Sequence, residues 1–155
     1  GYILTNYHVI ADGDLDYQVH FQNGEQLLAQ VVRYHPLYDL ALLKVDTVGL
    51  KPFYINLTQS IDVGEEAYAL GTPYDIDLGA SVTKGIISGK RKDGNRILIQ
   101  TDVSISPGNS GGALISSTGE LIGVVNEKVL GMGVEGIGFA IPAFHISDAL
   151  MLEFK

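Results

Sequence analysis

The chain has 155 residues, with 10 Lys and Arg against 18 Asp and Glu and a net charge of −8, a length that suits one domain or two very small ones. Its composition of 46% hydrophobic and 18% charged residues supplies a core and argues against disorder. The acidic balance argues against a nucleic-acid binder, zero cysteines exclude disulfides and thiolate chemistry, and no segment approaches the ~18 apolar residues of a membrane span.

The first part of the chain consists of short apolar segments separated by Gly, Asn, Asp or Pro. We expect about five strands there, and the segments cover residues 2–5, 17–21, 26–34, 40–45 and 53–57. Residues 17–21 alternate apolar and polar, as a half-buried strand does. Asn23-Gly24 follows directly and is a strong signal for a hairpin turn.

The second part continues this pattern after a break at 60–66, with apolar segments at 67–70, 80–88, 96–101, 113–115, 121–126 and 136–141. Asp93-Gly94 marks a second tight turn. Only residues 142–154 look helical, with Pro142 suited to a first helical turn.

Many short strands with a turn signal every 8–12 residues are typical of an all-β sandwich or barrel. The 19 glycines, about 12% of the chain against a usual ~7%, fit such a fold because turns, bulges and barrel corners need glycine. If both parts form closed barrels without a free edge, the first is one strand short. We expect the missing strand to precede Gly1.

Three polar segments stand out against this background. TNYHVI (5–10) has a histidine directly after an apolar strand, YDLALL (38–43) has an acid that opens a buried strand, and SPGNSGG (106–112) has a serine among glycines. Each is ordinary alone. Together they supply a nucleophile, an imidazole to take its proton and a carboxylate to orient the imidazole, in the chain order His8, Asp39, Ser110.

These segments resemble the signature segments of the trypsin-like (chymotrypsin-fold) serine proteases, and most closely those of the bacterial HtrA/Deg branch. The likeness covers nearly the whole chain, because it continues at residues 69–73, 81–88, 99–102, 119–123 and 136–142. It implies an all-β fold of two six-stranded antiparallel β-barrels, the first without its N-terminal strand, followed by a C-terminal helix. The expected boundaries are 1–60 for the truncated N-terminal barrel, 61–142 for the C-terminal barrel and 143–154 for the helix.

The resemblance also implies the chemistry. His8 would act as general base and then as acid, Asp39 would orient it, and Ser110 would form the acyl-enzyme. The backbone N–H groups of Gly108 and Ser110 would form the oxyanion hole, with Asn109 shaping the loop. In the HtrA relatives this loop switches between ordered and collapsed forms, which implies a low resting activity. No cofactor and no metal are expected.

Specificity can be predicted in part. The base of the primary pocket should lie shortly before the nucleophile, at Ser104-Ile105, where no acid is present to pair with a substrate Lys or Arg. Ile105 would make the pocket shallow and apolar, which favours small aliphatic P1 residues such as Val or Ala. By likeness, Val125, Asn126 and Glu127 form the edge that pairs with the substrate backbone, and Gly138 is a pocket wall.

The family likeness implies polypeptide substrates, unfolded proteins in particular, and a role in protein quality control. It also implies an extracytoplasmic location, in the bacterial periplasm or cell envelope, although any signal would lie upstream of Gly1. The family likeness is also compatible with a homo-oligomer. The alternative is a protease-like peptide-binding module that no longer cleaves.

Three other sequence motifs lack the neighbouring secondary structure or the residues that their functions require. Gly108-x-Ser110-x-Gly112 fits the nucleophile elbow of α/β-hydrolases, but a strand rather than a helix is expected next. Residues 131–136 fit G-x-G-x-x-G but also precede a strand. Residues 12–16 begin like a calcium loop, yet Tyr17 occupies the glycine position. The remaining histidines lack metal-like spacing and are interpreted as structural or surface residues: His20, His35 and His145.

Overall fold

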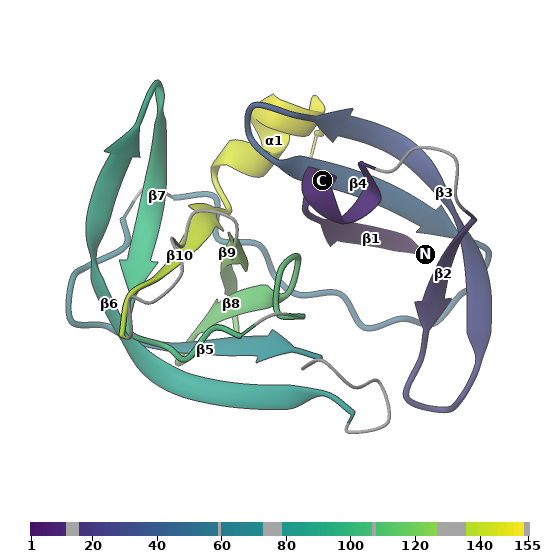
Figure 1. The fold of residues 1–155 in the computed structure, drawn as a ribbon, viewed down its shortest axis with the longest axis horizontal. Helices are drawn as coiled ribbons and strands as arrows, with labels where there is room; N and C mark the ends of the chain where they lie inside the picture. Colours follow the sequence, from purple (N-terminus) through teal and green to yellow (C-terminus); the bar gives the residue numbers. More distant parts are fainter. Residues whose placement is uncertain (12–15, 59, 73–78, 107, 127–135, 154–155) are drawn as a thin grey trace. The chain divides into compact units, whose positions relative to one another are not determined.

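The computed structural model describes residues 1–11, 16–58, 60–72, 79–106, 108–126 and 136–153. The chain forms two compact units (Figure 1). The first comprises Gly1–Pro52 and Ile146–Lys155, and the second comprises Phe53–His145.

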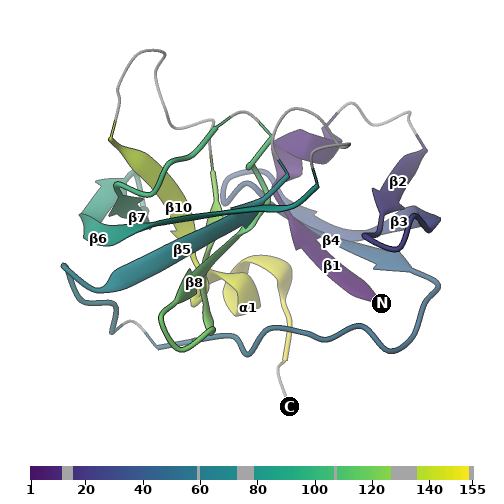
Figure 2. The same ribbon diagram turned by 90° about the horizontal axis from the view of Figure 1, so that it is seen from below.

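The first unit contains a four-stranded antiparallel sheet in the order β1-β4-β3-β2. Its strands are β1 (Tyr2–Thr5), β2 (Tyr17–His20), β3 (Gln26–His35) and β4 (Leu40–Val45). The apolar sequence LALLKV places β4 inside the sheet, where five of its six residues are buried. β1 runs beside β4 (Figure 2), with Thr5 opposite Ala41. The end of β1 therefore lies next to the start of β4.

The hairpin of β2 and β3 confirms the turn predicted at Asn23-Gly24. Gly24 has a φ of 83°, and its N–H donates to the carbonyl of Phe21 over 2.9 Å. Only glycine adopts this backbone conformation without strain. A β-bulge between Val31 and Arg33 then shifts the pairing of β3 with β4.

The second unit is built on a closed antiparallel barrel in the order β10-β7-β6-β5-β8-β9. The strands are β5 (Glu66–Gly71), β6 (Ser81–Asp93), β7 (Arg96–Thr101), β8 (Ala113–Ser116), β9 (Leu121–Val125) and β10 (Gly138–Pro142). Inward-facing side chains from these strands form one aliphatic core, which includes Ala67, Ile87, Ile99, Leu114 and Val125. Closure leaves this sheet without a free edge.

The second predicted turn, at Asp93-Gly94, is also confirmed, but the strand before it is longer than predicted. β6 continues through Asp93, which pairs with Arg96 across the turn, and forms a long hairpin with β7 (Figure 1). A bulge between Ile87 and Gly89 interrupts the register. The charged residues after Gly89 are exposed, so pairing with β7 rather than burial keeps this end of the strand extended.

The strand predicted at residues 53–57 is wrong. Ile55 makes only an isolated parallel bridge to Leu121, and the segment belongs to the second unit. Tyr54 is 85% exposed, so the segment buries no continuous face. The Asn56 side chain accepts a hydrogen bond from the backbone N–H of Thr58, a local turn that ends the extended run. The first unit therefore has four strands among its described residues rather than five.

The C-terminal helix is present but shorter than predicted. α1 spans His145–Leu150, because Pro142 is still part of β10 and Met151 adopts a left-handed φ of 49°. The guanidinium of Arg33 donates to the carbonyls of Leu150 and Met151, which satisfies the end of the helix. With a closed barrel, a half-barrel sheet and this helix, the chymotrypsin-like fold class is confirmed.

Among the described residues, no helix has the length and apolar character needed to cross a membrane.

A surface ion pair joins β5 and β6 on the outside of the barrel. Lys84 Nζ lies 2.6 Å from Glu66 Oε1, and both side chains are about half exposed. The hydrogen bond from Lys84 lowers the pKa of Glu66, and the same bond raises the pKa of Lys84. Both groups therefore stay charged at neutral pH and belong to the solvated face.

Candidate active site

His8 and Asp39 form a close pair in the first unit. His8 lies in the 3₁₀ helix η1 (Tyr7–Ile10), directly after β1, and Asp39 immediately precedes β4. They meet because β1 and β4 are antiparallel neighbours, so the chain leaving one strand adjoins the chain entering the other. The β1–β4 pairing thus brings together two residues that are 31 positions apart.

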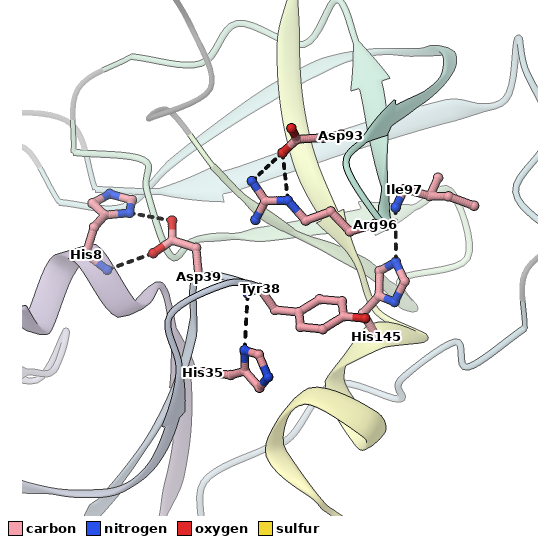
Figure 3. Close-up of polar contacts among 8 residues, drawn as sticks. All are labelled: His8, His35, Tyr38, Asp39, Asp93, Arg96, Ile97 and His145. Carbon is pink, nitrogen blue, oxygen red and sulfur yellow. Dashed lines mark hydrogen bonds and ion pairs between the residues drawn. The ribbon is translucent and has the colours of Figure 1, made fainter.

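The pair is held at two points (Figure 3). The backbone N–H of His8 donates to Asp39 Oδ1 over 2.8 Å, and His8 Nδ1 lies 2.6 Å from Asp39 Oδ2. When the carboxylate is ionised and the ring is neutral, this contact places the proton on Nδ1 and leaves the lone pair on Nε2, because an ionised carboxylate only accepts hydrogen bonds. The Asp39 side chain is 7% exposed and that of His8 25% exposed. The arrangement can present a proton acceptor at Nε2 and stabilise the cation that forms there.

Ser110 lies in the second unit, in the loop between β7 and β8. Two successive turns shape this loop: the Asn109 N–H donates to the Ser106 carbonyl, and the Gly112 N–H donates to the Asn109 carbonyl, each over 2.9 Å. Gly108 has a φ of 96°, a conformation that glycine adopts readily. Pro107 lies outside the described residues.

Asn109 is a buried polar residue of this loop, at 7% exposure. Its Oδ1 has no hydrogen-bond partner among the described residues. The side chain lies against Gly71 of β5, where an added Cβ would overlap Asn109 Oδ1 and lie 2.8 Å from its Cγ. Glycine at position 71 therefore makes room for Asn109, a contact that the sequence analysis did not foresee.

Ile105 and Gly138, predicted to form the pocket, are in contact. A Cβ at Gly138 would lie 2.5 Å from Ile105 Cδ1, so the Ile105 side chain occupies the space directly over this glycine. Ile105 also packs on the barrel core. The nearest acid in sequence, Asp102, accepts a hydrogen bond from the backbone N–H of Ile86 over 2.7 Å. Thr83 Oγ1 donates to the Ser104 carbonyl and fixes the same segment to β6.

The predicted substrate-pairing edge is partly used by the barrel itself. The N–H of Val125 donates to the Gly112 carbonyl, and its carbonyl accepts from the Gly111 N–H. The Asn126 N–H donates to the Phe139 carbonyl. The backbone of Val125 therefore holds the serine loop in place. Glu127 lies outside the described residues.

Two of the other histidines have structural contacts, and the third, His20, is exposed on β2. The ring of His35 lies edge-on to Tyr38, 5.0 Å away, and His145 Nε2 accepts from the Ile97 N–H over 3.4 Å (Figure 3). No group of three metal-ligating side chains occurs in the part of the chain that the structure describes. The calcium-like and G-x-G-x-x-G segments fall almost entirely outside that part.

Comparison with known proteins decides the family. The model of the trypsin-like peptidase domain matches residues 1–124. The chain belongs to this family. The family is one of serine endopeptidases, and the predicted HtrA/Deg likeness is confirmed by named relatives.

These relatives include a probable periplasmic serine endoprotease, DegP-like, from Pseudomonas putida strain W619, which is 40% identical over all of this chain. The serine endoprotease DegS of Escherichia coli K12 is 42% identical over 97% of it. The solved HtrA-type protease AlgW with a decapeptide superposes with a TM-score of 0.85 at 37% identity, over 97% of this chain and 48% of that one. The trypsin-like domain described here spans 33% of the DegP-like protein and 44% of DegS.

Proposed function

We propose that the chain hydrolyses peptide bonds in polypeptides through a triad of His8, Asp39 and Ser110. The observation that carries the proposal is the two-point contact of Asp39 with His8. This contact favours the tautomer that a general base needs. A histidine that is only exposed on the surface does not require such a contact. The glycine-flanked Ser110 supplies the nucleophile in the segment that matches the family.

The proposed mechanism requires His8 Nε2 within hydrogen-bond reach of Ser110 Oγ. Nε2 takes the serine proton as Oγ attacks the substrate carbonyl, and the N–H groups of Gly108 and Ser110 stabilise the oxyanion. His8 then protonates the leaving amine, which breaks the C–N bond and leaves an acyl-enzyme. Water hydrolyses the ester in the same way and restores the serine. Asp39 stays ionised throughout and stabilises the imidazolium.

An active-site label tests this proposal. We expect a fluorophosphonate probe to label the intact protein and to fail with Ser110→Ala. Ser116→Ala is the matched control, because Ser116 Oγ contacts Thr118 in a surface turn of the same barrel and should not affect labelling. A folded wild-type protein that stays unlabelled and cleaves no unfolded protein would instead support the peptide-binding module.

We further propose that the P1 pocket is shallow and apolar and takes Val or Ala. The support is the Ile105 side chain lying over Gly138 and the commitment of Asp102 to the Ile86 N–H. Asn126 and Glu127 are proposed to pair with the substrate backbone, with Val125 anchoring them to the barrel.

The specificity proposal predicts cleavage of a diverse protein digest mainly after small aliphatic residues. Ile105→Ala should deepen the pocket and raise kcat/KM for a Leu or Met P1 residue relative to Val by about tenfold, since one methylene in a hydrophobic pocket is worth roughly 10–200-fold. Cleavage-site mapping with both proteins measures this. Cleavage mainly after Lys or Arg would contradict the pocket assignment.

The natural setting is also a proposal. The Pseudomonas relative is named as periplasmic, which supports an extracytoplasmic location for the protein that contains this chain. Unfolded polypeptides are the proposed substrates, consistent with a backbone-pairing edge that reads side chains only at one shallow pocket.

A further inference from the structure

Asn6 makes an unusual contact next to the histidine. It is completely buried and occupies the N-cap position of η1. An asparagine there ordinarily accepts a hydrogen bond from the backbone N–H two or three positions later. Asn6 makes no such bond. Its Nδ2 instead donates to the backbone carbonyl of Asp39 over 3.0 Å.

The N–H group that a cap would engage is used by the catalytic pair. The second helical N–H belongs to His8, and it donates to Asp39 Oδ1 over 2.8 Å. The Asn6 side chain thus binds the Asp39 backbone, while the Asp39 side chain binds the His8 backbone and ring. These hydrogen bonds link the three residues into one network across β1 and β4.

Asp39 needs such support because of its backbone. Its φ of 54° lies in the left-handed region, which non-glycine residues occupy only when their surroundings hold them there. Two donors converge on its carbonyl, Asn6 Nδ2 and the Tyr7 N–H at 3.1 Å. Its own N–H donates to Pro36 over 3.2 Å. The direction of the carboxylate depends on this conformation.

The second amide atom of Asn6 argues against a purely structural role. Asn6 Oδ1 is buried with no hydrogen-bond partner among the described residues. An unsatisfied buried acceptor destabilises a fold. Asparagine at this position therefore combines a useful donor with an unfavourable acceptor, which an apolar side chain of similar shape would avoid.

We infer that Asn6 is a positioning residue: its amide holds Asp39 in the left-handed conformation that aims the carboxylate at His8. The inference rests on the proposed function, since the importance of this aim for turnover depends on His8 being the general base. Asn6 is assigned no contact with substrate.

Asn6→Leu in the intact protein tests the inference, because leucine has a similar branched shape and removes both the donor and the unpaired acceptor. We expect kcat to fall about tenfold, the effect of one lost hydrogen bond, with KM changed less than twofold. The melting temperature should stay within about 3 °C of the wild-type value. Asn6→Ala provides a second variant.

A proton NMR measurement in the Ser110→Ala background separates positioning from turnover. The proton between His8 Nδ1 and Asp39 Oδ2 should give a resolved low-field resonance, which Asn6→Leu shifts or broadens. Tyr17→Phe is the matched control, since it removes the 2.6 Å bond from Tyr17 Oη to the Ile10 carbonyl at the other end of η1. It should lower the melting temperature by about 3 °C and leave the resonance and kcat unchanged.

The outcomes are distinct. An unchanged kcat and resonance in a folded Asn6→Leu protein would overturn the inference, as would failure of both Asn6 variants to fold, which would make Asn6 structural. A change of the resonance in a protein whose wild type neither labels nor cleaves would support the positioning role and reject the proposed function.

Discussion

Asp39→Asn should lower kcat about 10⁴-fold, the size of effect seen when the orienting acid of such a triad loses its charge. The geometry gives the reason. The His8 N–H donates to Oδ1, so an asparagine keeps its carbonyl oxygen there and turns its amide N–H₂ towards His8 Nδ1. Nδ1 must then accept, and the ring proton moves to Nε2. The proposed base has lost its lone pair, although the fold is unchanged.

Steady-state kinetics on a peptide substrate measure this effect, with circular dichroism to verify folding. Asp46→Asn is the matched control, because Asp46 is an exposed acid just after β4 and should retain full activity. If the Asp39→Asn protein keeps more than a tenth of the wild-type kcat, His8 is not oriented by Asp39 in the working enzyme.

Gly112→Ala should be nearly inactive. A Cβ at this position would overlap the carbonyl oxygen of Leu70 in β5 and lie 2.8 Å from that of Asn109. Both neighbours are backbone atoms, which cannot rotate away as a side chain could. Because the backbone of Gly112 is also hydrogen-bonded to Asn109 and Val125, the serine loop has to move. A displaced loop would lose a proposed oxyanion donor, which lowers kcat by about 10²–10³-fold, and overpacking lowers the free energy of unfolding by about 1–3 kcal/mol.

Gly119→Ala provides the comparison. Gly119 has a φ of 84° and no atom within 4 Å of an added Cβ. An alanine there should lower the free energy of unfolding by only about 1–2 kcal/mol through backbone strain and leave kcat/KM intact. Urea unfolding and kinetics on both variants separate crowding from strain. Equal activity in the two proteins would show that the close packing of Gly112 has no bearing on catalysis.

Local features were readable from the sequence because their causes are local. Alternation predicted β2, and the dipeptides Asn23-Gly24 and Asp93-Gly94 marked turns whose left-handed glycines the structure contains. The motif around His8, Asp39 and Ser110 named the residues of the proposed site from residue type and spacing. The family matches place that motif in a trypsin-like domain.

Features that depend on contacts between residues distant in the sequence could not be predicted. The segment 53–57 has the composition of a strand, but it finds only one bridge, to Leu121. The end of the helix at Leu150 is satisfied by Arg33, more than a hundred residues earlier, whose guanidinium donates to the Leu150 carbonyl. In both cases the contact is with a partner distant in the sequence, and residue patterns contain no information about that partner.

The sequence by itself therefore determined the fold class, the turns and the three residues proposed for catalysis. The tertiary structure alone decided how two of them meet, because the register of β1 against β4 places the His8 N–H and Nδ1 on the two oxygens of Asp39. It also decided that the Asn6 amide donates to Asp39 instead of capping its own helix. The hydrogen-bond partner of a side chain such as Asn6 depends on which groups the folded chain places within hydrogen-bond distance, and the local sequence does not specify this.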